Sequence, residues 1–143
     1  MVTVISGLVG GLVATIVMTA FQMGLGEDSP PPTALFWSKY VGNGSPEDYM
    51  LQGIVLHMFY GIAAGAVFAL AAPVLGFVSV ASIGIAVLWG LAYGVMVFVG
   101  AAVFWTNIVL GLEPEKKMVG MFLLFHLIYG AVLGAWLGAG ILA

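Results

Sequence analysis

The residues of this chain best suited to chemistry are its two histidines, His57 and His126. Each begins the same pattern, His-x-x-Tyr-Gly-x-x-x-Gly, so Tyr60 and Tyr129 follow three residues later. Both copies lie within apolar segments, where an ionisable side chain is costly and therefore marks a candidate functional site. The pattern predicts that the two histidines act in the interior of an apolar structure.

Three roles are open to such a pair. A neutral imidazole can ligate haem iron, and the glycines one turn beyond each histidine would leave a flat gap for a porphyrin. It can also relay protons or hold a permeating ion, because its pKa lies near physiological pH. Finally, it can donate a hydrogen bond to a neighbouring helix and fix the helix register, a role equally open to Tyr60, Tyr129, Thr15 and Thr19. The sequence leaves these alternatives open.

Other kinds of chemistry have little support. Every Lys, Asp and Glu lies outside the long apolar segments and Arg is absent, so no catalytic triad or carboxylate pair can form within them. Cysteine is also absent, and two imidazoles alone are too few for a closed metal site. We therefore expect no enzyme activity and no protein-bound metal. The net charge of −3 argues against nucleic acid as a partner.

The composition predicts an integral membrane protein whose main partner is the lipid bilayer. Hydrophobic residues make up 63% of the chain and charged residues 6%, compared with about 25% charged residues in soluble domains. Four apolar runs are each long enough to cross a bilayer as a helix, which takes about 20 residues. They are Val4–Met23, Met50–Ala72, Val80–Ala102 and Met118–Leu142. The expected fold is an all-α bundle of four transmembrane helices.

The segments after the first and third runs should lie at the membrane surface. Three prolines, Pro30 to Pro32, cannot continue a helix, and the aromatic stretch Thr33–Val41 suits a short helix at headgroup level. Ser45 is then a good N-cap for the second run. The third apolar run continues beyond Ala102 to Leu110, which is too long for one upright crossing of about 30 Å. We expect this last part to bend into the interface.

The sequence also predicts an internal duplication of a two-helix unit. Phe-Trp at 36–37 and 104–105, Pro-Glu at 46–47 and 114–115, and a Met at 50 and 118 recur in the same order as the histidine motif. We interpret residues 1–143 as a single membrane domain with one repeat at about 1–74 and the other at about 75–143. Because each unit holds two helices, the copies would be parallel repeats about an axis along the membrane normal.

Each predicted span carries small residues at every fourth position, which allow another helix to approach closely. The glycines of these stripes are Gly7, Gly11, Gly53, Gly61, Gly65, Gly90, Gly94, Gly130, Gly134 and Gly138. A chain this short cannot enclose a wide pathway alone. We therefore expect a homo-oligomer or a subunit of a larger membrane complex.

All charged residues fall in the linkers 24–49 and 111–117, which the two-helix units place on the same side. The three Lys residues assign that side to the cytoplasm by the positive-inside rule. The expected location is the cell membrane.

The run Gly-Leu-Val-Gly-Gly-Leu-Val-Ala-Thr-Ile-Val-Met-Thr at 7–19, the Pro-Glu-Asp-Tyr at 46–49 and the histidine motifs resemble small uncharacterised four-helix membrane proteins of prokaryotes, including halophilic archaea. The resemblance implies the four-helix class and brings no activity. We favour a permeation or carrier protein, because repeats that flank intramembrane polar groups are common in transporters. The alternatives are an accessory subunit of a membrane complex, and a b-type haem electron-transfer protein with His57 and His126 as axial ligands.

Overall fold

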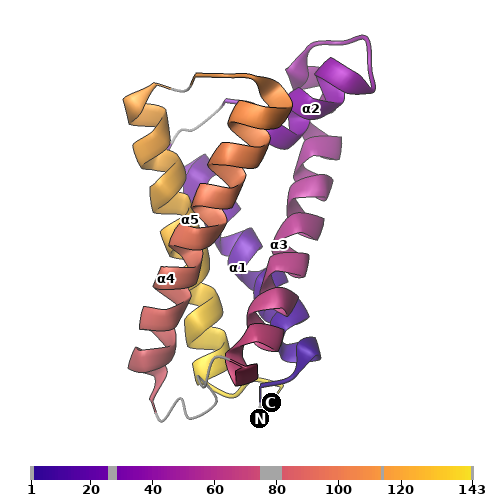
Figure 1. Cartoon of the computed structure of the whole chain (residues 1–143). Coiled ribbons are helices and arrows are strands. Elements are labelled where there is room, and N and C mark those ends of the chain that lie inside the picture. Colours follow the sequence, from indigo (N-terminus) through magenta and orange to yellow (C-terminus); the bar gives the residue numbers. More distant parts are fainter. Residues whose placement is uncertain (1, 26–28, 75–81, 114, 143) are drawn as a thin grey trace.

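The computed structural model describes residues 2–25, 29–74, 82–113 and 115–142. All the regular structure within these ranges is helical, and four helices are long and apolar enough to cross a membrane (Figure 1). They are α1 (Val4–Gly24), α3 (Met50–Val74), α4 (Ile83–Ala101) and α5 (Lys116–Gly138). The all-α, four-span prediction is confirmed. The predicted start of the third span, Val80, and Pro114 of the second Pro-Glu pair lie outside the described residues.

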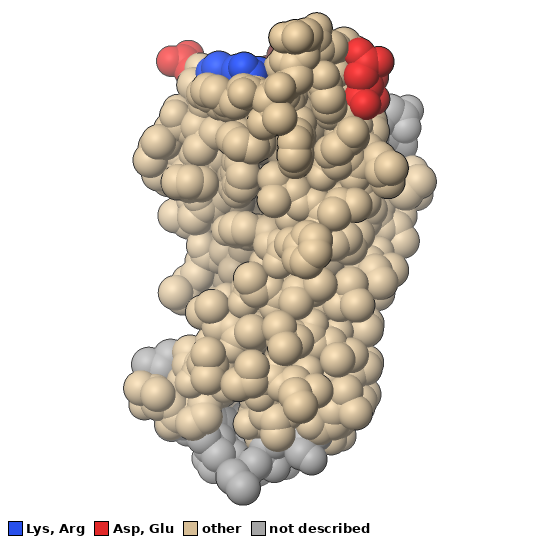
Figure 2. Space-filling view, turned by 90° about the vertical axis from the view of Figure 1, so that its right-hand side faces the viewer, with Lys and Arg blue, Asp and Glu red and all other residues tan. Residues whose placement is uncertain are grey.

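The helices form two hairpins that share one bundle. α1 packs against α3 and α4 against α5, and α1 also packs along α5. Both chain ends lie at one end of the bundle, and the linkers after α1 and α4 lie at the other (Figure 1). On the face shown in Figure 2, the acidic and basic side chains gather at this second end and the rest of the surface is uncharged. The charged linkers are therefore on the same side of the molecule.

The ends of the chain are tied together by hydrogen bonds. The side chain of Thr3 caps α1 by accepting a hydrogen bond from the backbone N–H of Ser6, and it donates to the carbonyl oxygen of Leu142 at 2.9 Å. The hydroxyl of Ser6 donates to the carbonyl oxygen of Ile141 at 2.6 Å. α5 ends at Gly138 rather than at the predicted Leu142, because Gly140 adopts a positive φ of 68° that takes the chain out of the helix.

The linker after α1 folds into two short helices. α2 (Pro32–Tyr40) begins with Pro at its first position, where the missing N–H has no helical partner to lose. The 3-10 helix η1 (Pro46–Tyr49) follows and begins at the predicted N-cap: Ser45 and Asp48 form a capping box. α2 rests on the start of α3, where Thr33 donates a hydrogen bond of 2.8 Å to the carbonyl oxygen of Gly53.

The segment after Ala101 differs from the prediction. We expected a bend, but the backbone stays helical as η3 (Ala102–Leu110), a π-helix that extends α4 in the same direction (Figure 1). The last carbonyl groups of η3 accept hydrogen bonds from side chains of α2. The Lys39 ammonium donates to the carbonyl oxygen of Leu110 at 2.8 Å, and the Tyr40 hydroxyl donates to that of Val109. α2 therefore holds the end of η3 in place.

The buried core lies between α1, α3 and α5. Its fully or nearly buried members are Ala14, Met18, Phe68, Phe125, Tyr129, Leu133 and Leu137. Tyr93 of α4 extends this core by stacking on Phe68, with ring centroids 4.6 Å apart. The interior is thus filled by large apolar and aromatic side chains, while the outward faces carry apolar residues suited to lipid.

Candidate functional site

The glycine stripes of α1 and α3 face each other inside the chain. A Cβ atom added to Gly11 would collide with the backbone of Gly61 and Gly65, and one added to Gly7 would collide with Gly65 and Ala69. Further along, Gly61 lies against the side chain of Thr15. These two helices therefore touch backbone to backbone.

α4 and α5 make an equivalent contact. Gly90 lies against the backbone of Gly130 and Gly134, and Gly94 lies against the backbone of His126 and Gly130. Gly138 packs on Ala86 and Ile83 of α4. Of the predicted stripe, only Gly53 meets a different element, because it packs on Ala34 of α2. The glycine stripes pack against other helices of the same chain. They therefore no longer support self-association, which stays a prediction.

His126 is buried beside two phenylalanine rings. Its exposed fraction is 5%, and its Nδ1 lies 2.7 Å from the carbonyl oxygen of Phe122 one turn earlier in α5. A carbonyl oxygen can only accept, so Nδ1 carries the hydrogen and donates it. The ring centroids of Phe122 and Phe98 lie 4.5 and 6.1 Å from that of the imidazole.

His57 lies in α3 and is partly buried. Among the described residues, His57 has no hydrogen-bond partner. The structure places the two histidines on α3 and α5, two helices that belong to different hairpins. It leaves them in different surroundings, one bonded to backbone and the other without a protein partner in the described part of the chain.

One of the two motif tyrosines joins the helices that carry the histidines. The hydroxyl of Tyr129 is buried and donates a hydrogen bond of 2.7 Å to the carbonyl oxygen of Gly61. Tyr60 makes no such bond to any described residue. Tyr93 was not among the predicted polar residues, but its hydroxyl donates a hydrogen bond to the carbonyl oxygen of Ala64 at 2.7 Å. A tyrosine at mid-span needs a partner for its hydroxyl, and this need was the signal that could have identified it.

The two threonines of α1 lie in different settings. Thr15 is fully buried and donates to the carbonyl oxygen of Gly11 at 2.7 Å, so its hydroxyl is satisfied within its own helix. The hydroxyl oxygen of Thr19 is buried without a hydrogen-bond partner in the described ranges. Thr15 thus serves the contact with α3, while Thr19 keeps an unpaired polar group in the interior.

The geometry does not suit a haem between the two histidines. The flat gap would have to lie over the glycines that follow each histidine, but Gly61 and Gly65 are covered by α1, and Gly130 and Gly134 are covered by α4. The hydrogen bond from Tyr129 to Gly61 also bridges α3 and α5, between which the porphyrin would have to fit. The donor residues are present, but the space is filled.

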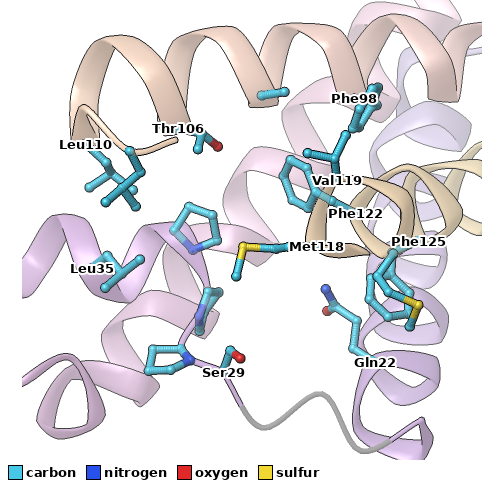
Figure 3. Close-up of a pocket in the computed structure, with 16 residues that line it drawn as sticks. Gln22, Ser29, Leu35, Phe98, Thr106, Leu110, Met118, Val119, Phe122 and Phe125 are labelled. Atoms are coloured by element: carbon cyan, nitrogen blue, oxygen red, sulfur yellow. The ribbon is translucent and has the colours of Figure 1, made fainter. Parts of the chain in front are cut away.

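A cavity of about 240 Å³ lies at the end of the bundle that carries the charged linkers (Figure 3). Its walls come from the end of α1, the proline segment, α2, η3 and the first turns of α5. Gln22, Ser29 and Thr106 are the polar residues that line it, all other lining residues are apolar, and none is charged. The cavity combines residues distant in sequence, so no local motif could have identified it.

The cavity and the buried histidine share two residues. Phe98 and Phe122 line the cavity and also pack against the ring of His126. Figure 3 shows both rings at one side of the cavity, across from Leu35. The two phenylalanines therefore lie between the cavity and His126.

Comparisons with protein-family models, with curated proteins and with solved structures gave no match. This result is consistent with the resemblance to uncharacterised four-helix membrane proteins, which implies no activity.

Proposed function

We propose that this chain is a carrier-type membrane protein that takes a neutral, largely apolar molecule into the cavity between α1, α2, η3 and α5. The observation that carries this proposal is the cavity itself, an uncharged chamber at one end of a membrane-spanning bundle. Ligand sites in proteins are concave and mostly apolar, with a few polar groups that fix orientation, and this lining has that composition.

The lining selects against charged solutes. A charged group in an apolar chamber needs a counter-charge or a dense set of hydrogen bonds, and the cavity offers neither. Its volume of about 240 Å³ is just below the usual range of about 300–1,000 Å³ for ligand sites. The solute is therefore small and neutral.

The histidine pair supplies the next polar groups along the bundle. The ring of His126 packs against those of Phe98 and Phe122, and His57 lies in α3. A rotation of the Phe122 side chain would bring the cavity into contact with the imidazole. In this proposal Phe98 and Phe122 close the inner side of the cavity. The histidines bind a solute, or accept its proton, after it has passed the two rings.

A flux assay in liposomes tests this function. Purified protein is reconstituted, and the release of small neutral solutes and of protons is followed by fluorescence. Ala102→Phe fills the cavity and should abolish the flux, whereas Val103→Phe places the same ring on the outer, exposed face of η3 and should leave it unchanged. His126→Ala should lower the flux without changing the residues that line the cavity. Equal flux in both phenylalanine variants, or none in the wild-type protein, contradicts the proposal.

We also propose that the two hairpins are copies of one unit, about 1–74 and 75–143. The contact of Gly11 with Gly61 and Gly65 corresponds to that of Gly90 with Gly130 and Gly134, and these glycines occupy matching places in the two copies. The copies are not packed symmetrically, because α1 lies along α5 while α3 and α4 meet mainly through long side chains such as Tyr93. The cavity is formed by both copies, because its walls come from α1 and α2 of the first and from η3 and α5 of the second.

The remaining expectations belong to the same proposal. The chain acts without catalysis, in the cell membrane, with both charged linkers in the cytoplasm. The chain also forms a homo-oligomer or is a subunit of a larger membrane complex, and a role as an accessory subunit is the alternative function. Native mass spectrometry from mild detergent separates these cases, because a homo-oligomer appears as a multiple of the chain mass and an accessory subunit keeps a second protein. A lone monomer over a wide concentration range contradicts both.

A further inference from the structure

Thr106 is the most buried of the three polar residues that line the cavity. Its exposed fraction is 9%, and its side chain lies on the cavity wall formed by η3 (Figure 3). Its hydroxyl makes no hydrogen bond to any described residue. A hydroxyl that lines an apolar cavity and has no hydrogen-bond partner in the described part of the chain is available to a molecule bound there.

The contrast with Thr15 shows why the hydroxyl is unpaired. A threonine in an α-helix commonly bonds to the carbonyl four residues earlier, as Thr15 does with Gly11. Thr106 lies instead in a π-helix, whose wider turn changes the spacing to the preceding carbonyl groups, and the equivalent bond is not made. Single π-helical turns are rare and occur frequently at functional sites. The π-helix therefore leaves the Thr106 hydroxyl directed at the cavity.

The other polar residues of the cavity restrict the chemistry of the partner. Gln22 extends from the end of α1 towards the cavity, and Ser29 lies at the edge formed by the proline segment (Figure 3). Both are neutral. The nearest cation on α2, Lys39, is engaged with the carbonyl oxygen of Leu110 and does not line the cavity. The site thus offers hydroxyl and amide groups beside apolar walls, and no group that would pair with a carboxylate or a phosphate.

We propose that the cavity binds a neutral single-chain amphiphile from the bilayer, of the class of medium-chain alcohols, whose hydroxyl bonds to Thr106. The apolar chain would lie between Phe98, Met118 and Phe125, which line the same cavity. The volume of about 240 Å³ suits one short chain and leaves no room for a two-chain lipid. This inference specifies the chemical class of the proposed solute. That the bound alcohol is also transported rests on the proposed carrier function. Binding itself is independent of transport.

Photolabelling in nanodiscs provides the test. The probe is a ten-carbon alcohol with a diazirine on its chain, and the labelled residues are mapped by mass spectrometry. We expect labels in η3 and in the first turns of α5, with competition by decanol and much weaker competition by decane. Thr106→Val keeps the shape and removes the hydroxyl, so it should weaken the apparent affinity by about threefold to tenfold, the effect of one hydrogen bond. Thr106→Ser should retain most of the affinity.

Two controls make the result decisive. Ile108→Val changes the exposed face of the same π-helix and should leave labelling unchanged. Helix content by circular dichroism confirms that each variant folds. Equal labelling of wild type and Thr106→Val, or equal competition by decane and decanol, overturns the inference. Labelling without flux in liposomes would support this site and contradict the carrier proposal, whereas flux of a small solute without labelling would do the reverse.

Discussion

The hydroxyl of Tyr129 in α5 lies 2.7 Å from the carbonyl oxygen of Gly61 in α3, and this bond joins the two copies of the histidine motif. The tyrosine comes from the second copy and the glycine from the first. Because no water competes for hydrogen bonds in the bilayer core, a buried hydroxyl there must find a protein partner. The bond therefore links the two hairpins, which also meet where α1 packs along α5.

Removing this hydroxyl should weaken the bundle. We expect Tyr129→Phe to lower the free energy of unfolding by about 0.6–1.7 kcal/mol, the range for interhelical hydrogen bonds in membranes. Unfolding in mixed micelles with increasing denaturing detergent measures it. Tyr60→Phe is the matched control, because the Tyr60 hydroxyl bonds to no described residue and its loss should cost less. An equal effect of the two substitutions would show that the bond to Gly61 contributes nothing specific.

The contact between α4 and α5 should not tolerate a methyl group. A Cβ atom on Gly130 would overlap the backbone carbonyl of Gly90, and backbone cannot move aside as a side chain can. We expect Gly130→Ala to destabilise the protein by about 1–3 kcal/mol, the usual cost of overpacking. Gly120→Ala, in the same helix but with open space around the added atom, should be neutral or slightly stabilising. The same unfolding assay compares them.

The end of η3 should loosen when Lys39 is replaced. Lys39→Met keeps the length of the side chain and removes the donor that binds the carbonyl oxygen of Leu110. We expect faster hydrogen exchange of the backbone in 102–110, measured by mass spectrometry in nanodiscs. Lys116→Met is the control, since Lys116 is exposed at the start of α5 and makes no hydrogen bond to a described residue. Unchanged exchange in η3 would mean that Tyr40 and the Gly111 cap hold this segment without Lys39.

The arrangement of the linkers predicts a simple labelling pattern. The chain has no cysteine, so single substitutions report one position each. Asn43→Cys and Glu113→Cys lie in the two charged linkers and should react with an impermeant maleimide from the same side of sealed vesicles. Ala139→Cys, at the other end of the bundle, should react only from the opposite side. Labelling of Asn43→Cys and Glu113→Cys from different sides would contradict the four-span topology.

The sequence determined the features that depend on local interactions. The four spans follow from long apolar runs, and the turn at Ser45 follows from a capping box whose members are three residues apart. Both signals act between residues close in the chain, so the tertiary environment does not override them. The histidine motif likewise identified Tyr129 as a candidate for a polar contact, although its partner could not be named from the sequence.

Only the tertiary structure decided where the helices meet and what space they leave. The expected bend after Ala102 is replaced by a π-helix because Lys39 and Tyr40, distant in sequence, supply donors to its last carbonyl groups. The cavity and the unpaired hydroxyl of Thr106 arise in the same way, from the packing of α1, α2 and α5 around that helix. Hydrophobic periodicity reports which face of a helix is buried but not which helix covers it, and a cavity is defined by the side chains of several elements together.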